Sequence, residues 1–126
     1  MVNRSKKKGS QFETDCVEFL RAHGLPYAER RAQRGSADRG DIAGVIGWVL
    51  EVKNCAAMAL AEWMKEAERE SINDHSYRFA VIHKRKGRNV RDAYVTMPLW
   101  LAVEWWADPP VYQPRLEEAV EVGDRL

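Results

Sequence analysis

Residues 40–54, "GDIAGVIGWVLEVKN", form an apolar run that three charged residues interrupt. The alternation of apolar residues, with glycines in the middle, predicts two strands joined by a tight turn. Glu51 and Lys53 are two residues apart on the second strand, so their side chains project from the same face. Asp41 belongs to the first strand, and a hairpin brings it alongside Glu51 and Lys53. The stretch therefore predicts a hairpin that carries Asp41, Glu51 and Lys53 side by side.

This group of charges is typical of a metal-dependent site. Two carboxylates that lie close together repel each other unless a cation or a shared proton joins them. Oxygen ligands suit Mg²⁺, with Mn²⁺ as a substitute, and Asp41 and Glu51 are the predicted ligands. Lys53 would orient or deprotonate the attacking water, or stabilise charge on a phosphate. The predicted chemistry is metal-assisted hydrolysis of a phosphodiester. The alternative is a salt bridge at a sheet edge.

A third carboxylate belongs to the first predicted helix, "QFETDCVEFLRAH", residues 11–23. At about 100° per residue, Glu13 falls between Leu20 and Val17 on the apolar face of this helix. A buried carboxylate needs a basic residue, a metal ion or a neighbouring acid as its partner. Glu13 is therefore a candidate third metal ligand. The alternative is a capping box, in which Ser10 begins the helix and Glu13 reaches back to a backbone N–H group.

The remaining pattern predicts an α/β fold with a mixed central sheet flanked by helices. Strands are expected over residues 26–31, 77–84 and 92–97, in addition to the hairpin. Helices are expected over residues 59–71 and 98–108, and a weak one over 115–122. In the helix over 59–71, Trp63 and Ala67 lie on the apolar face and Glu66 on the polar face. With 126 residues, the chain is expected to form one domain over residues 10–110, between a disordered basic tail (1–9) and a C-terminal extension (111–126).

Charge and cysteine content narrow the class of protein. The net charge is +1, yet basic residues gather in the N-terminal tail, in the loop before Asp41 and around residues 84–91. Such local clusters favour an anionic partner such as nucleic acid, although each could also be a solvated surface. No apolar run is long enough to cross a membrane, and no secretory signal is evident. Cys16 and Cys55 are expected to be reduced thiols in a cytoplasmic protein.

The pattern of a helix carboxylate, then Asp, then E-x-K on a hairpin resembles the PD-(D/E)xK nuclease superfamily. The stretches "KKGSQFETDCVEFLRAHG", "RRAQRGSADRGDIAG" and "VLEVKN" are most similar to the archaeal-type Holliday junction resolvases, from about residue 8 to about residue 95. The resemblance implies a restriction-endonuclease-like fold and a homodimer that cuts four-way DNA junctions with paired nicks, in DNA recombination or repair. It also implies Mg²⁺ dependence and products with a 5′-phosphate.

Carried over by position, the catalytic residues are Glu13, Asp41, Glu51 and Lys53, of which Glu13, Asp41 and Glu51 are metal ligands. Arg30 or Arg31 matches a basic residue near the cleaved strand, and Ser36 matches a loop serine near the site. The remaining DNA contacts are expected from the basic clusters, namely Lys6, Lys7, Lys8, Arg34, Arg39, Lys84, Arg85 and Lys86. Two departures stand out, because Gly40 replaces the proline before the aspartate and Asn54 follows the lysine.

Two other functions fit the same residues. One is another PD-(D/E)xK enzyme, such as a flap or fork nuclease or a restriction-like nickase. The other is a DNA-binding module without catalysis, which the intact set of Asp41, Glu51 and Lys53 disfavours. The helix "PLWLAVEWWAD" has no counterpart in the family pattern. It is apolar on nearly all sides, so it is covered either by the sheet alone or by a second subunit as well.

Overall fold

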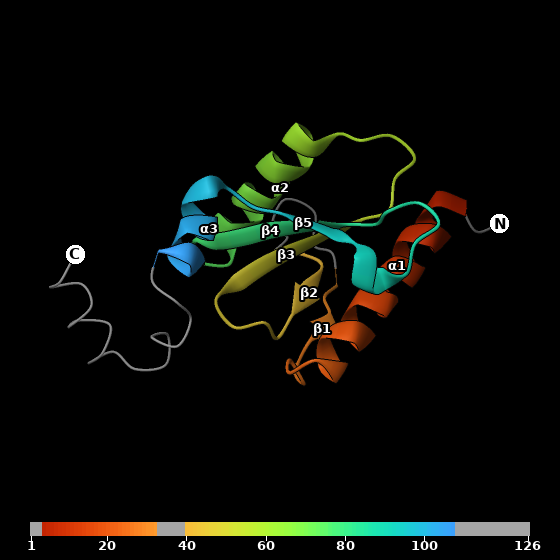
Figure 1. Ribbon diagram of the computed structural model, residues 1–126, viewed down its shortest axis with the longest axis horizontal. Helices are drawn as coiled ribbons and strands as arrows, with labels where there is room; N and C mark the ends of the chain where they lie inside the picture. Colours follow the sequence, from red (N-terminus) through yellow and green to blue (C-terminus); the bar gives the residue numbers. More distant parts are fainter. Residues whose placement is uncertain (1–3, 33–39, 108–126) are drawn as a thin grey trace, which may run out of the picture.

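The computed structural model describes residues 4–32 and 40–107, with side chains from Lys8 onward. Five strands form one sheet in the order β1-β2-β3-β4-β5. They span Glu29–Arg30 (β1), Ile42–Ala43 (β2), Trp48–Lys53 (β3), Arg78–His83 (β4) and Tyr94–Thr96 (β5). Only the β3–β4 pair is parallel, and the other three pairs are antiparallel. The predicted α/β architecture, a mixed sheet flanked by helices, is confirmed (Figure 1).

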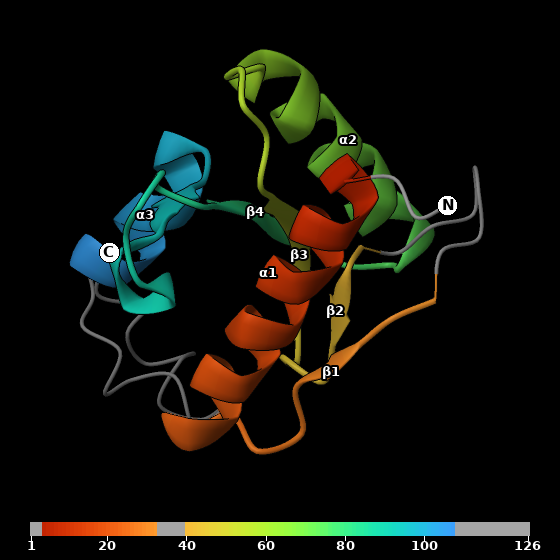
Figure 2. The same cartoon turned by 90° about the vertical axis from the view of Figure 1, so that its right-hand side faces the viewer.

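The two faces of the sheet are covered by different helices. Helix α1 (Arg4–Ala22) packs Phe12 and Cys16 on the face that carries Leu50 and Val52. Helix α2 (Leu60–Asn73) packs Trp63 and Ala67 on the opposite face. Figure 2 shows α1 running across the sheet, with α2 beyond it on the other side. Because side chains alternate along β3, Glu51 and Lys53 point toward α2 rather than toward α1.

The predicted hairpin is present as β2 and β3, with Ile42 opposite Leu50. The turn has Gly44 and Gly47 at φ values of +85° and +83°, in the left-handed region that favours glycine. A side chain at Gly44 would also collide with the carbonyl of Tyr27, because an added Cβ would lie 1.8 Å from that oxygen. The glycine therefore lets the turn lie against the segment that leads into β1.

Helix α1 begins at Arg4, earlier than the sequence predicts. Residues 1–9 are expected to be disordered, but the chain is helical from Arg4 onward. Gly9 lies within this helix, although a glycine there costs about 1 kcal/mol of helix stability relative to alanine. Ser10 lies inside the helix, where its carbonyl accepts a hydrogen bond from Thr14 Oγ1 at 3.2 Å. The capping box at Ser10 is therefore wrong, and Glu13 has a different partner.

Helix α3 (Leu99–Trp106) follows β5 and lies beside β4 (Figure 1). Leu101 is its buried residue, while Trp100, Trp105 and Trp106 are 50%, 43% and 73% exposed. The ring of Trp100 contacts Phe79, and Glu104 pairs with Arg78 at 3.3 Å. One side of α3 thus packs on the sheet and the rest of its apolar surface is open. The helix expected over residues 115–122 lies outside the described residues.

A search of the described residues finds no helix that combines the length and the apolarity needed to cross a bilayer.

Candidate active site

Asp41 is held in place by backbone hydrogen bonds immediately before the short strand β2. Its N–H group donates to the carbonyl of Leu50, and its own carbonyl accepts from Arg31. Its side-chain Oδ2 accepts a hydrogen bond from the N–H of Val52 at 2.7 Å. The carboxylate thus extends the contacts with β3 to the residue before β2 begins.

Gly40, the residue before Asp41, has a backbone conformation that explains why a glycine is found there. Gly40 has a φ of +102°, which the proline of the family pattern cannot adopt because its ring holds φ near about −65°. An added Cβ at Gly40 would lie 2.9 Å from the side chain of Val49. The departure from the motif therefore changes how the chain enters β2 but still presents Asp41 to β3.

Glu51 and Lys53 lie at the carboxyl-terminal half of β3, on the face that α2 covers. Glu51 is almost completely buried, at 3% exposure. Lys53 Nζ lies 3.6 Å from Glu51 Oε2 and 2.6 Å from Glu66 Oε1 of α2. The sequence predicts that Asp41, Glu51 and Lys53 lie side by side. The structure adds helix α2 to this group, a helix that the sequence pattern does not connect with them.

Helix α2 adds two carboxylates to the site. Ligand atoms of Glu51, Glu66 and Glu70 all lie within 4.8 Å of one another, so these three residues could hold a metal ion. Glu70 is 2% exposed. Glu66 was expected on the polar face of this helix, and Glu70 was not predicted for the site. The signal for Glu70 is its position seven residues after Trp63, about two turns later on the same apolar face.

The pKa values of the acidic residues in the cluster are raised by burial and by one another. Burial, opposed by the hydrogen bond from Val52 and assisted by the charge of Glu13, raises the pKa of Asp41 to about 7. Burial and a hydrogen bond with Glu70 raise the pKa of Glu51 far above its usual range. Burial disfavours a charged acid, and a second acid nearby disfavours it further. A group of acids in this state would gain strongly from a cation that joins them.

Lys53 is a cation in this arrangement. Burial lowers the pKa of its ammonium group, but the hydrogen bond to Glu66 and the charges of Glu51 and Glu66 raise that pKa overall. A lysine with a raised pKa keeps its proton near neutral pH. Of the roles expected for Lys53, stabilisation of negative charge and orientation of a water fit this state better than proton abstraction.

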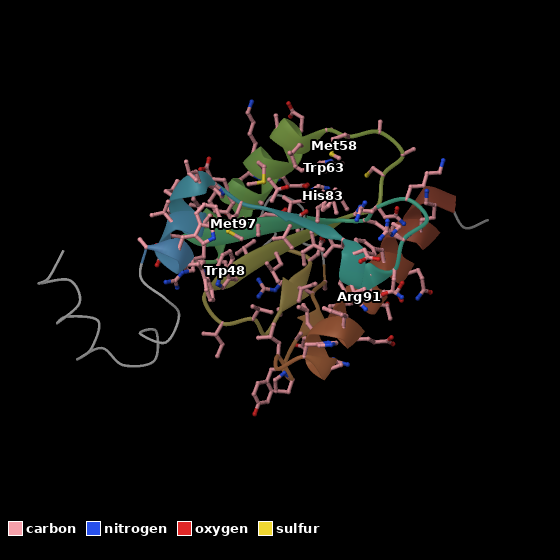
Figure 3. All side chains as sticks on the ribbon, viewed as in Figure 1. Trp48, Met58, Trp63, His83, Arg91 and Met97 are labelled. Atoms are coloured by element: carbon pink, nitrogen blue, oxygen red, sulfur yellow. The ribbon has the colours of Figure 1, made fainter. Side chains whose placement is uncertain are left out.

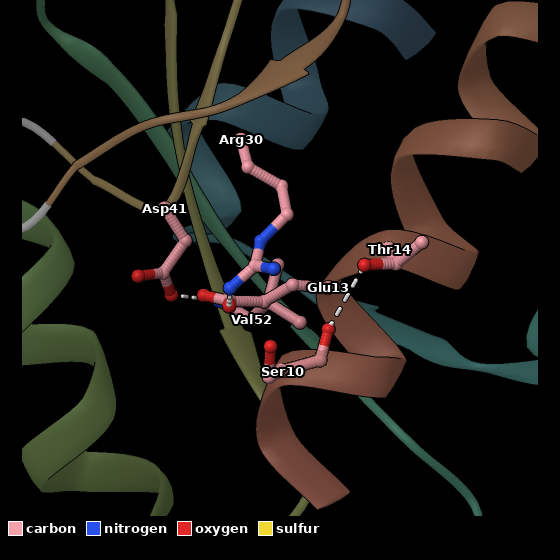
Figure 4. Close-up of polar contacts among 6 residues, drawn as sticks. All are labelled: Ser10, Glu13, Thr14, Arg30, Asp41 and Val52. Carbon is pink, nitrogen blue, oxygen red and sulfur yellow. Dashed lines mark hydrogen bonds and ion pairs between the residues drawn. The ribbon is translucent and has the colours of Figure 1, made fainter. Parts of the chain in front are cut away.

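The partner of Glu13 is a basic residue. A buried carboxylate is expected to pair with a basic residue, a metal ion or a neighbouring acid. Arg30 on β1 donates a hydrogen bond to Glu13 Oε2 at 2.8 Å. Figure 4 shows this pair beside Asp41, whose Oδ2 faces Val52. The pair sits on the side of α1, whereas Glu51 faces α2. Glu13 is therefore outside the carboxylate group of Glu51, Glu66 and Glu70, although its charge acts on Asp41.

The predicted DNA-contact residues fall into four groups. Arg30 is half-exposed in its pair with Glu13, and Arg31 pairs with Asp74 at 3.2 Å. A second group, Lys84, Arg85 and Lys86, borders a pocket at the carboxyl end of β4. Lys8 is exposed on α1, where its carbonyl accepts a hydrogen bond from Asn54. The last group lies outside the described residues or their described side chains and comprises Lys6, Lys7, Arg34, Ser36 and Arg39.

Comparisons of the chain with protein-family models, with curated proteins and with solved structures found no match, so the resemblance of its motifs to a nuclease superfamily stays a prediction.

Proposed function

We propose that this protein is a Mg²⁺-dependent endodeoxyribonuclease with a restriction-endonuclease-like fold, which cuts four-way DNA junctions by paired nicks. One observation carries the proposal. Glu51 lies on β3 beside Lys53, α2 contributes Glu66 and Glu70 to the same face, and Asp41 is bound to β3 next to them through the N–H of Val52, outside the group of three glutamates. Acids that share a site with a lysine suit metal-assisted hydrolysis of a phosphodiester. The preference for four-way junctions rests on the motif resemblance.

The donor set fits Mg²⁺. The candidate ligands are carboxylates only, and Mg²⁺ prefers oxygen ligands and usually takes one or two carboxylates from the protein. Glu51 is the central candidate because it belongs both to the hairpin and to the group with Glu66 and Glu70. Asp41 and Glu70 are charged neighbours of Glu51, because the negative charge of each one raises the pKa of Glu51. When bound, Mg²⁺ supplies charge neutralisation and Lewis-acid polarisation at a phosphoryl oxygen.

The side chains of the site then have separate tasks. The ammonium group of Lys53, held by Glu66 and Glu51, is placed to stabilise negative charge that develops on the phosphate and to orient a water for in-line attack. Glu66 holds Lys53 at 2.6 Å and thereby positions the ammonium group. Arg30 is half-exposed beside Asp41, where its guanidinium is available to a DNA phosphate.

The proposal predicts how the protein chooses its substrate. A synthetic four-way junction, end-labelled on each strand in turn, would be incubated with and without Mg²⁺ beside a linear duplex and a fork. We expect symmetric nicks in two opposite strands of the junction, only with Mg²⁺, and a steep loss of binding as salt rises. Equal cutting of all three substrates would support a general nuclease of the same superfamily. Tight binding without cutting would indicate a DNA-binding module.

Paired nicks need two active sites, so the proposal includes a homodimer. The exposed tryptophans of α3 supply a candidate interface, since contiguous exposed aromatic surface is typical of subunit contacts. Trp106→Glu places a charge on this surface at a position that is 73% exposed, so folding should be retained. We expect the wild type to sediment as a dimer and Trp106→Glu as a monomer.

Ile46→Glu, at a position that is 92% exposed in the β2–β3 turn, is the matched control and should remain dimeric. If Trp106→Glu sediments like the wild type while its circular dichroism is unchanged, α3 is not in the interface.

A further inference from the structure

A pocket of about 420 Å³ opens beside the candidate active site. It lies between the segment that leads from β3 into α2 and the turn that follows β4. Lys53 is one of its lining residues, so the pocket adjoins the group of Glu51 and Glu66. Its volume is within the range of about 300–1,000 Å³ that holds small organic ligands. The proposed cleavage reaction does not use this space.

The floor of the pocket is aromatic. The ring of His83 lies between two other rings, 5.7 Å from Trp63 and 5.9 Å from Tyr94. A hydrogen bond of 2.8 Å between His83 Nε2 and Thr96 Oγ1 holds the imidazole in place. Figure 3 shows Met58, Trp63 and His83 gathered over this end of the sheet. Trp63 and His83 are buried, at 8% and 5% exposure, so the surface open to a ligand comes from Tyr94 and Met58, which are 52% and 65% exposed.

The rim of the pocket is basic. Lys84, Arg85, Lys86 and Arg88 follow β4 and line the pocket together. The guanidinium of Arg85 lies over one face of the Tyr94 ring, 4.6 Å from its centroid, so a base that stacks on that face would replace this cation and leave it beside the phosphate. Arg88 pairs with Asp92 at 3.4 Å. Among the described residues that line the pocket, none is acidic.

A flat ring with an attached anion suits this combination of surfaces. A nucleobase stacks on exposed aromatic side chains, and a phosphate is held by neighbouring lysine and arginine side chains. A base within a duplex cannot reach such a floor, because it is stacked and paired on both sides. The matching ligand is therefore a nucleotide that has left the stack. Because Lys53 borders both places, this nucleotide would lie next to the phosphate that is cut.

We propose that the pocket bounded by Trp63, His83 and Tyr94 binds one unpaired nucleotide of the DNA strand, stacking its base on the exposed ring of Tyr94, which the buried rings of Trp63 and His83 support, and holding its phosphate with the basic rim. This inference rests on the proposed function for the position of the strand. It adds that the enzyme recognises a branch by an unpaired nucleotide beside the cleavage point. The base itself is not read, because stacking tolerates every base.

The test uses the full-length protein without divalent metal, so that binding is measured apart from cleavage. The probe is a duplex with a single 2-aminopurine bulge, compared with the same duplex fully paired. We expect tighter binding of the bulged duplex and quenching of 2-aminopurine fluorescence by stacking. Tyr94→Leu should weaken binding of the bulged duplex by about 5- to 100-fold, the effect of one lost base–aromatic stack. An abasic bulge should weaken wild-type binding in the same way.

Tyr77→Leu is the matched control. Tyr77 is 51% exposed and also carries an arginine over its ring at 4.6 Å, but it lies by α3, away from the pocket. It should bind the bulged duplex like the wild type. Cys55 gives a second readout, because it is exposed and lines the pocket, whereas Cys16 is buried with a pKa raised to about 12. The bulged duplex should slow alkylation of Cys55 by N-ethylmaleimide more than the paired duplex does.

Equal binding of bulged and paired duplexes would overturn the inference, and so would equal losses in Tyr94→Leu and Tyr77→Leu. Free dAMP that binds as tightly as the bulged duplex would also overturn it, since the pocket would then be a mononucleotide site. Failure of the proposed function would give a different experimental result. In that case the bulged duplex is bound with quenching, but the same duplex is not cut when Mg²⁺ is added. Cleavage without a preference for the bulge rejects the pocket alone.

Discussion

Replacing Asp41 by Asn or Glu51 by Gln should abolish Mg²⁺-dependent cleavage of the four-way junction, with a rate loss of about 10³-fold or more. Each change keeps the shape of the side chain and removes a negative charge that the metal would need. A loss of 10³-fold corresponds to about 4 kcal/mol of transition-state stabilisation, which is within the several kcal/mol expected of a Lewis acid. The rate would be measured on denaturing gels with end-labelled strands.

The fold should survive both changes. In Asp41→Asn, the amide side chain still has an oxygen that can accept the hydrogen bond from the N–H of Val52, now 2.7 Å from Asp41 Oδ2. Burial and the hydrogen bond with Glu70 raise the pKa of Glu51, so a neutral Gln of the same shape should be tolerated at this buried position. Glu29→Gln, an exposed acid on β1, is the control and should cut at the wild-type rate. Cleavage by Asp41→Asn at the wild-type rate would remove the hairpin from the catalytic site.

Glu70→Gln should remove most of the thermal stabilisation that Mg²⁺ gives to the wild type. A ligand that binds only the folded state adds about 1.4 kcal/mol at ten times its Kd. For a domain of this size, that free energy corresponds to a rise in Tm of about 5–10 °C. Glu70 has an oxygen within 4.8 Å of both Glu51 and Glu66, so its loss should weaken the binding of the ion. Differential scanning fluorimetry with and without Mg²⁺ measures the shift.

The same measurement distinguishes two ligand sets. The sequence groups Glu13 with Asp41 and Glu51, whereas the packing of α2 brings Glu70 to Glu51 and leaves Glu13 with Arg30. We therefore expect Glu13→Gln to keep the rise in Tm that Glu70→Gln loses. Glu68→Gln, an exposed neighbour on α2, serves as the control and should behave like the wild type. The opposite pattern, with the shift lost in Glu13→Gln and kept in Glu70→Gln, would place the ion on the side of α1.

Much of this site follows from local pattern alone. A strand alternates its side chains, so the spacing of Glu51 and Lys53 puts both on one face wherever the strand lies. A tight turn with glycines brings the residues before one strand beside the end of the next, which accounts for Asp41. Helical periodicity likewise places Glu13 on an apolar face and requires a partner for it. These features depend on residues close together in the chain, so the sequence is enough to predict them.

Other features depend on which helix covers which face, and this is a property of long-range packing. Periodicity predicts that Glu13 is partly buried, but the identity of its partner follows from β1 pairing with β2, which brings Arg30 across to α1. Whether the face with Glu51 meets α1 or α2 depends on the parallel pairing of β3 with β4, because the crossover between them carries α2.

That crossover is the reason why Glu66 and Glu70 join the site. On α2 alone, Glu66 belongs to a polar face and Glu70 interrupts an apolar one. Once the helix packs over β3, Glu66 reaches Lys53 and Glu70 reaches Glu51. The positions of Asp41, Glu51 and Lys53 on the hairpin therefore follow from the local sequence. The complete carboxylate group exists only because α2, which follows the hairpin in the chain, packs back over β3.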